Sequence, residues 1–295
     1  MRSLFLPGFA SIVANLGRQS SSIHPLSSNR FPMKSRLRLT FAFAVAVALG
    51  LASGFVSPVQ ADEPDGSHSM DVLLITSGCC HDYDFQTKSL QLAAKAHGLA
   101  VNWTVVSEGG TGTSAKIDFY DDPDWADGFD LVIHNECFAK TDDPEYIRRI
   151  TEPHFAGVDA IVIHCAMHTY RDTQIDDWRK FLGVTSRRHE HKSHYPVTVV
   201  DGDHPIVAHV PGDYVTPIDE LYVIERTWPN TTVLATSESE KTGESHPVFW
   251  LNRFGKADVF GTTYGHSNET FQDEVFLRTL TNAMKHLTHS ETTGP

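Results

Sequence analysis

Val72-Leu73-Leu74-Ile75-Thr76 is the stretch that decides the fold, because it is short, almost wholly apolar and closed by Ser77-Gly78. Runs of this kind are typical of parallel strands that are buried on both faces. Two further runs of the same kind follow at Asp130-Leu131-Val132-Ile133-His134 and Ala160-Ile161-Val162-Ile163-His164. Three such runs in one chain predict a sheet whose strands are joined by crossover segments.

Helices are predicted in the segments between and after these strands, as crossover connections require. Gln86 to His97 is amphipathic and is followed by Gly98, a residue that commonly ends helices. Leu99 to Val106 adds a strand, and Pro144 to Phe155 and Ile175 to Leu182 read as two more helices. This alternation predicts an α/β fold with a doubly wound, mostly parallel sheet flanked by helices. Ligands of such sheets bind beyond the carboxyl ends of the strands.

The second half of the chain is richer in strands than the first. Short strands separated by turns are predicted at residues 196–200, 221–224, 232–236, 248–251 and 257–263. A closing helix is predicted from Phe271 to Leu287. The chain shows no internal repeat and no linker, so residues 62–288 are predicted to form a single domain, followed by a frayed tail at residues 289–295.

The first 61 residues predict a secretory signal. They contain six Lys and Arg and no Asp or Glu, and a basic cluster ending at Arg38 precedes an apolar run from Leu39 to Val56. Val59-Gln60-Ala61 is a small-residue cleavage pattern. We therefore expect translation to start at Met33, after an upstream extension, and cleavage to follow Ala61. The mature chain would then be exported to the periplasm or the medium without a stable membrane span; an uncleaved anchor helix is the alternative.

The net charge of the chain limits the classes of molecule that it is expected to bind. After cleavage the chain would keep 234 residues, with 18 Lys and Arg against 37 Asp and Glu. A surface this acidic repels nucleic acid and anionic lipid. Neutral ligands such as sugars, and cationic ligands, therefore both remain open, and a small carbohydrate is the partner that we expect. The oligomeric state is not set by the sequence.

Cys79, Cys80, Cys137 and Cys165 all follow strand-like runs, whose ends should converge on one edge of the sheet. An exported chain with four cysteines admits disulfides, but an adjacent pair rarely bonds to itself, so their pairing is left open. Cys165 occupies the place of a nucleophile in related folds. It lacks the flanking glycines of a nucleophile elbow, so a packed cysteine is the better prediction.

The placement of the histidines is unusual. The chain contains 17 histidines, and several of them stand where predicted strands end. His81, Glu136, His164 and His266 are expected to face one crevice, with Asp82 beside the first of them. Imidazole can donate or accept protons near neutral pH. We expect His81 or His164 to act as acid or base, Asp82 to orient it, and Glu136 and His266 to bind or transfer protons. Any one strand-end histidine is more often structural than catalytic.

A metal site is the second use that these histidines allow. His189 and His191 flank Glu190 and share one side of the chain if the segment is extended. His168 lies four residues after His164, a spacing that suits one helical face. His189, His191 and His168 are therefore the candidate ligands, and zinc is the ion that imidazole ligands favour.

The remaining aromatic and imidazole side chains have structural readings. His97, His154 and His286 lie on predicted helices and are expected at the surface. Trp178 and Trp250 are expected in the core. His189 and His204 are second choices for a catalytic role.

The ordered set of motifs resembles the ThuA-like (trehalose-utilisation) family of the class I glutamine amidotransferase-like, flavodoxin-like superfamily. The resemblance covers residues 70–287, and its motifs are Gly78, His81-Asp82, His164-Cys165-Ala166, Trp178 with Phe181-Leu182-Gly183, His189, His204-Pro205-Ile206, Asp219-Glu220-Leu221-Tyr222, Pro247-Val248-Phe249-Trp250, Gly255-Lys256 and Gly265-His266. One departure is Ala257-Asp258, where the family often has Gly-Arg, so an anion-binding role there is not expected.

The resemblance implies a flavodoxin-like sheet and a carbohydrate-related activity. Family members are associated with oxidised-sugar pathways, in which a dehydrogenase makes a 3-keto glycoside. A ketone at C3 acidifies the C2 proton, so a His/Asp/Glu crevice can support elimination and hydration, or isomerisation. Two alternatives stay open: a non-catalytic sugar-binding or accessory module, and a metal-dependent hydrolase of another bond.

Overall fold

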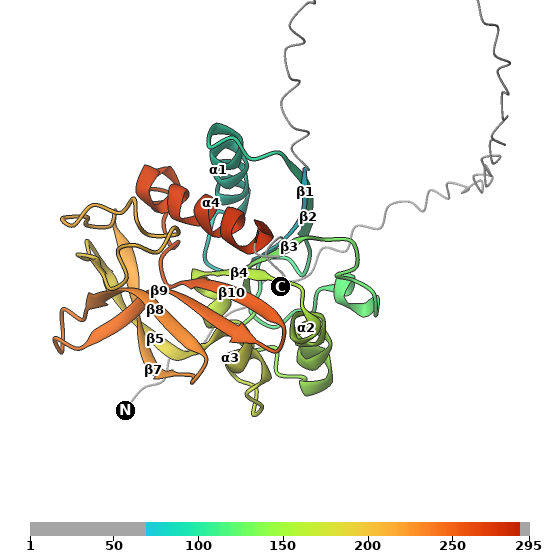
Figure 1. The fold of residues 1–295 in the computed structure, drawn as a ribbon. Coiled ribbons are helices and arrows are strands. Elements are labelled where there is room, and N and C mark those ends of the chain that lie inside the picture. The colour runs from blue at the N-terminus through green and yellow to red at the C-terminus, as the bar shows by residue number, and fades with distance from the viewer. Residues whose placement is uncertain (1–68, 290–295) are drawn as a thin grey trace, which may run out of the picture. The chain divides into compact units, whose positions relative to one another are not determined.

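The structure, a computed structural model, describes residues 69–289 and contains one large mixed sheet (Figure 1). Its strand order is β2-β1-β3-β4-β10-β9-β8-β6. The strands are β1 (Met70–Gly78), β2 (Val101–Ser107), β3 (Leu131–Cys137), β4 (Ala160–Ile163), β6 (Thr198–Val199), β8 (Thr231–Glu238), β9 (Ser245–Phe254) and β10 (Ala257–Thr262). The first five in this order pair in parallel, and the last three add antiparallel strands.

The parallel part has the strand order that flavodoxin-like sheets share, so the predicted fold class is confirmed. Val72 pairs with Leu131 across β1 and β3, and Val132 pairs with Ala160 across β3 and β4. Every residue of β3 and β4 is buried, which explains why these strands read as continuous apolar runs.

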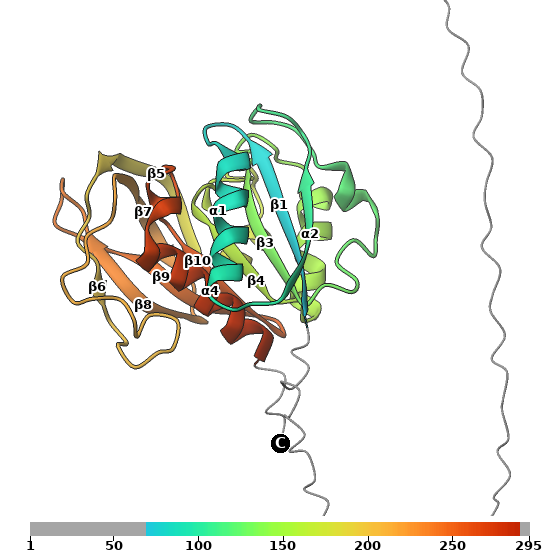
Figure 2. The same cartoon turned by 90° about the horizontal axis from the view of Figure 1, so that it is seen from above.

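Helices cover both faces of this sheet (Figures 1 and 2). The helices α1 (Tyr83–Ala96) and α4 (Glu274–His289) lie together on one face, and α2 (Pro144–Ala156) and α3 (Asp177–Leu182) lie together on the other. The helix α2 begins at an Asp143 cap, whose carboxylate accepts from Glu145 N, and its C-cap is Gly157.

A second, two-stranded sheet pairs β5 (Val184–Ser193) with β7 (Asp219–Thr227) in antiparallel register. The strand-rich second half is therefore confirmed, but β5 is a strand that the sequence did not predict. Its central residues, Arg187 to Lys192, are charged or imidazole side chains and most of them are exposed. Such a strand has no apolar run, and its pairing with β7 holds it extended.

Both tryptophans expected in the core are buried there. The Trp178 indole N–H donates to Ala166 O, and the Trp250 indole N–H donates to Leu182 O. His154, expected at the surface, is instead completely buried, because it lies on the same stripe of α2 as Tyr146, Ile147 and Ile150.

The predictions for the chain termini lie outside the described residues. These are the start at Met33, the cleavage after Ala61 and the tail beyond residue 289, all of which stay predictions. Within residues 69–289, no helix has the length and apolar character needed to cross a membrane.

Candidate functional site

A pocket of about 310 Å³ opens at the carboxyl edge of the parallel strands. It lies where the segments after β1, β4 and β10 meet the β5–β7 sheet. Its polar lining includes His81, His164, His189, His266, Glu220 and Tyr222. A wider hollow between α1 and β2 is lined by Leu92 and Trp103 but contains no histidine or carboxylate, so we place the chemistry in the first pocket.

Three histidines that the sequence expected together do converge in this pocket. The ring centroids lie 5.0 Å apart for His81 and His164, and 4.9 Å apart for His81 and His266. The rings of His164 and His266 lie 5.3 Å apart. They come from the ends of three different parallel strands, which is the convergence that the strand order requires.

Backbone carbonyls fix the orientation of two of these rings. His81 Nδ1 lies 3.1 Å from His266 O, and His164 Nδ1 lies 2.6 Å from Thr263 O. A carbonyl can only accept, so each Nδ1 carries the proton and each Nε2 keeps its lone pair. His164 Nε2 lies 3.2 Å from the Tyr222 hydroxyl, whereas His81 Nε2 is buried without a hydrogen-bond partner.

His164 adopts a backbone conformation that is rare for residues other than glycine. Its φ is +45°, directly after β4 and at the start of a short 3₁₀ turn, η2 (His164–Met167). Gly265 makes room for this turn, because a Cβ there would lie 2.9 Å from Ile163 Cγ2 and 3.3 Å from His164 Cβ. A strand followed by a tight turn is the geometry of a nucleophile elbow, but here the residue at the turn is a buried histidine that lines the pocket.

The strand β7 supplies the carboxylate and the phenol of the pocket. Alternate residues of a strand point to opposite sides, so Glu220 and Tyr222 face the pocket together. Glu220 Oε2 lies 3.3 Å from His266 Nδ1, 3.4 Å from His189 Nδ1 and 3.7 Å from His164 Nε2. One carboxylate therefore borders three imidazoles.

Asp219 lies beside this carboxylate on the strand but points the other way. It is fully buried and accepts from the backbone N–H groups of Gly265 and His266 at 3.0 and 3.2 Å. Burial raises the pKa of Asp219 to about 6, against the hydrogen bonds that lower it. Asp219 thus anchors the loop that presents His266 to the pocket.

The pocket keeps His81 and His164 neutral and Glu220 ionised. Burial lowers the pKa of His81 to about 4, and burial together with the neighbouring His81 lowers the pKa of His164 well below its usual value. Burial alone would raise the pKa of Glu220, but the contacts with His266, His189 and His81 outweigh it, so that pKa is lowered. At neutral pH the pocket thus offers imidazole lone pairs beside one negative charge.

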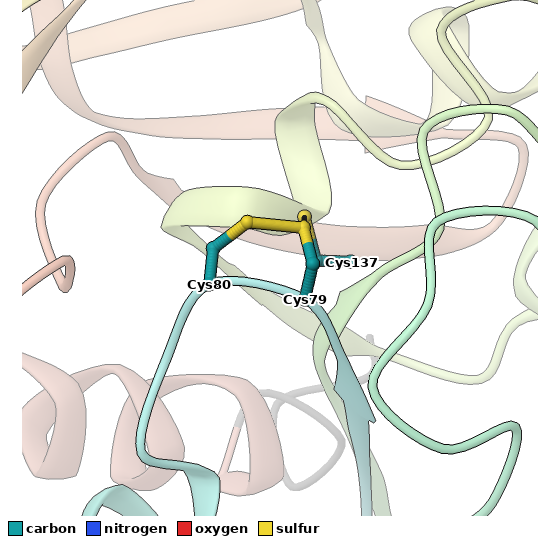
Figure 3. Close-up of side chains that lie close together, drawn as sticks. All are labelled: Cys79, Cys80 and Cys137. Atoms are coloured by element: carbon teal, nitrogen blue, oxygen red, sulfur yellow. Dashed lines mark hydrogen bonds between the residues drawn. A yellow bond between two sulfur atoms is a disulfide. The ribbon is translucent and has the colours of Figure 1, made fainter. Parts of the chain in front are cut away.

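The four cysteines meet at the rim of the same pocket and form two disulfides, Cys79–Cys80 and Cys137–Cys165. Figure 3 shows the adjacent pair bonded to itself, with the Cys137 sulfur beside it, 3.6 Å from Cys79 Sγ. The convergence of β3 and β4 brings Cys137 to Cys165, which leaves Cys79 and Cys80 to each other. Cys165 is therefore not a free thiol.

Two of the residues expected to carry catalysis lie outside the pocket. Asp82 does not orient His81; it caps α1 by accepting from Phe85 N, and it also accepts from Asn268. Glu136 points to the opposite side of the sheet, where it is buried against His134 at 3.0 Å. The side on which β3 presents Glu136 is set by packing against α2 and α3.

The predicted metal ligands are not brought together. His168 stacks on Tyr222 at 4.0 Å and lies 6.0 Å from the His189 ring, but His191 is exposed and pairs with Glu240. His204, a second choice, lies beside His286 away from the pocket. Among the described residues, the imidazole set with three ligand atoms within 4.8 Å of one another is His81, His164 and His266.

Glu220, Tyr222 and Asp219 are site residues for which no role was predicted. The run from Asp219 to Tyr222 stands among the motifs of the family resemblance, and its two acidic residues open a strand, which is the available signal. The residues that they contact in the pocket are far away in the sequence. Their role at the site can therefore be recognised only in the folded structure.

The model of a family described as trehalose utilisation, ThuA, matches residues 71–287. No curated protein sequence matches the chain. A ThuA-like protein of Parabacteroides merdae has a similar structure, with a TM-score of 0.59 and 19% identity over 75% of this chain and 90% of its own.

Two further structures resemble the chain. A ThuA-like protein of Bacteroides uniformis matches with a TM-score of 0.57 and 15% identity, over 74% of this chain and 91% of its own. A β-galactosidase of Bacillus circulans sp. alkalophilus matches with a TM-score of 0.50 and 13% identity, over 78% of this chain and 32% of its own. At these identities the likeness shows the fold alone.

Proposed function

The chain belongs to the ThuA family of trehalose utilisation, and from that premise we propose that it is an exported enzyme acting on a keto sugar or a keto glycoside. The reaction that the pocket supports best is proton transfer beside a carbonyl group, leading to elimination and hydration or to isomerisation. The observation that carries this proposal is a single ionised carboxylate, Glu220, in contact with several imidazoles in a closed-in pocket.

The size and charge of the pocket favour a small, neutral and polar ligand. Its volume of about 310 Å³ lies at the lower end of the range for small-molecule sites, which is about 300–1,000 Å³. Among the described residues, Arg171 is the only Lys or Arg that lines the pocket. A monosaccharide unit with several hydroxyl groups meets these conditions.

Glu220 is suited to remove the proton. A ketone at C3 of a glycoside makes the C2 proton acidic, and a carboxylate held in a partly buried site can take it. The electron pair left on C2 then expels the glycosidic oxygen from C1, and that oxygen takes a proton from His189, which acts in its imidazolium form beside Glu220. Water adds to the resulting double bond, so the net result is hydrolysis. His81, His164 and His266 line the wall that receives the sugar oxygens.

Export is part of the proposal. The leader pattern of residues 1–61 motivates it, and two disulfides support it, since such bonds persist in oxidising compartments. N-terminal sequencing of the protein recovered from the periplasm or medium tests this: Asp62 is the expected first residue, and retention of Met33 in an uncleaved cytoplasmic chain would reject it.

Glu220→Gln is the variant that tests the reaction. On a 3-keto glucoside we expect kcat/KM to fall about 100-fold or more, because general-base catalysis contributes about 10²–10⁴-fold. Glu225→Gln is the matched control, since Glu225 lies on the same strand, is exposed and is outside the pocket. It should keep the wild-type rate.

The outcomes separate the candidate functions. Absence of turnover by the wild-type chain on 3-keto glycosides, with retained binding, would favour a sugar-binding module. Equal rates for both variants would remove Glu220 from the mechanism.

A further inference from the structure

Three ring nitrogens, one each from His81, His164 and His266, lie within 4.8 Å of one another. In a tetrahedral zinc site with bonds of about 2.0–2.1 Å, ligand atoms stand about 3.4 Å apart. Small side-chain rotations close that difference. The three residues follow three different strands, so their approach results from the fold and not from local sequence.

The hydrogen bonds around these rings prepare them to bind a cation. The carbonyls of His266 and Thr263 hold the Nδ1 protons of His81 and His164, so each Nε2 keeps its lone pair. The His164 lone pair lies 3.2 Å from the Tyr222 hydroxyl, which a bound ion would displace. Metal-ligating histidines almost always donate their second nitrogen to a carbonyl or carboxylate in this way. His81 Nε2 is buried with no partner, a cost that a bound ion would remove.

Glu220 extends the same pattern to the third ring. Its Oε2 lies 3.3 Å from His266 Nδ1, although the geometry there falls short of a hydrogen bond. The carboxylate also places a negative charge 3.7 Å from His164 Nε2. It can therefore act as a fourth ligand or as the oxygen that orients His266, and in either role it favours a positive ion.

We propose that His81, His164 and His266 bind a divalent transition-metal ion, zinc in the first place, beside Glu220. When Glu220 orients His266, the three histidines leave one coordination position open to the pocket, as catalytic zinc sites do. This ligand set replaces the one expected from the sequence, and the proposal goes beyond the proposed function, because binding of the ion by the free protein does not depend on any sugar.

The chemistry of the ligands selects the class of ion. Imidazole suits zinc, copper, nickel and iron, whereas calcium and magnesium prefer oxygen ligands. The neighbouring cysteines do not compete, because all four are paired in disulfides and the ligand form of cysteine is the thiolate.

Preorganisation of the ligands supports the same conclusion. His164 has a positive φ, and Asp219 anchors the loop that carries His266. Both features hold an imidazole in a fixed position at the pocket, and a purely structural role in the core would not require them. Residues kept in rare backbone conformations cluster at binding and catalytic sites.

Zinc titration of the mature protein, after treatment with a chelator, tests the site. We expect one ion per chain by calorimetry and by elemental analysis after dialysis, and a rise of Tm on adding zinc. His81→Ala and His266→Ala should each weaken zinc binding about 100-fold or more and abolish the rise of Tm. His191→Ala is the matched control and should bind as the wild type does, since His191 is exposed and outside the pocket.

Cobalt substitution in the wild-type protein gives a readout that needs no variant. Cobalt bands of a four- or five-coordinate nitrogen and oxygen site are expected; sulfur-to-cobalt charge-transfer bands would move the ion to the cysteines and overturn the proposal. No stoichiometric zinc, or equal binding by His81→Ala, would do the same. Zinc binding without sugar turnover rejects only the proposed function, and turnover by a protein that binds no metal rejects only this site.

Discussion

His154 illustrates at the scale of one residue how burial changes chemistry. It lies fully buried on α2, with Nδ1 2.6 Å from Val158 O and Nε2 3.0 Å from His134 Nε2. Burial, with the nearby His134, lowers its pKa from 6.5 to about 3. Between about pH 3 and pH 6.5 the imidazole of His154 is therefore neutral in the folded protein but protonated in the unfolded chain.

This difference predicts a pH dependence of stability. The contribution of neutral His154 is fully present above pH 6.5 and is lost as the pH falls toward 3. Between pH 7 and pH 5 the loss from this residue should be about 2 kcal/mol. Urea unfolding at the two pH values should show a correspondingly smaller loss for His154→Gln than for the wild type.

His191→Gln provides the control, because its side chain is exposed, and it should lose as much stability as the wild type. If His154→Gln and the wild type lost the same amount between pH 7 and pH 5, the imidazole would not be neutral in the folded protein.

At the scale of an element, α1 shows why a carboxylate next to a histidine need not serve it. Asp82 precedes the first turn of α1, where backbone N–H groups lack partners, and its side chain accepts from Phe85 N at 3.2 Å. The strand β7 shows the opposite case, because its alternation turns Glu220 and Tyr222 into the pocket. The position of a residue within its element thus decides its role.

Substitution of Asp82 separates capping from catalysis. Asp82→Asn should keep both stability and turnover, since asparagine caps helices as well as aspartate does. Asp82→Ala should lower the free energy of unfolding by about 1 kcal/mol and leave kcat/KM close to wild type. Urea unfolding and steady-state rates measure the two effects. A large loss of kcat/KM in Asp82→Asn would show that the Asp82 carboxylate takes part in catalysis.

At the scale of the whole molecule, the Cys137–Cys165 disulfide joins two segments that the sheet already brings near. Cys137 ends β3 and Cys165 follows β4, and the bond closes a loop across a sequence separation of 28. Cys79 and Cys80 are adjacent, so their bond closes no loop of the unfolded chain. The entropy that a disulfide removes from the unfolded chain grows with loop length.

The two bonds should therefore differ in their effect on stability. Loop entropy predicts that Cys137→Ala/Cys165→Ala loses about 3–4 kcal/mol, whereas Cys79→Ala/Cys80→Ala should lose less than about 1 kcal/mol. Urea unfolding of both double variants, each with and without reductant, measures this. A loss of similar size in both would show that packing at the rim, and not loop closure, sets the effect.

The sequence by itself determined the parallel sheet, its flanking helices and the convergence of strand-end histidines. The apolar runs of β1, β3 and β4 are long enough to be buried on both faces, and such runs have few other stable arrangements. Parallel strands place their carboxyl ends at one edge, so the meeting of His81, His164 and His266 followed from topology.

Only the tertiary structure decided which polar side chains join them. A period of two shows that His134 and Glu136 share one side of β3, but only the fold shows that this side faces α2 and α3 and not the pocket. Glu220 enters the pocket because β7 pairs with the polar strand β5, a long-range pairing without a local signal. Contacts between segments distant in the chain depend on the packing of the whole core, and this is why the carboxylate of the site emerged only from the fold.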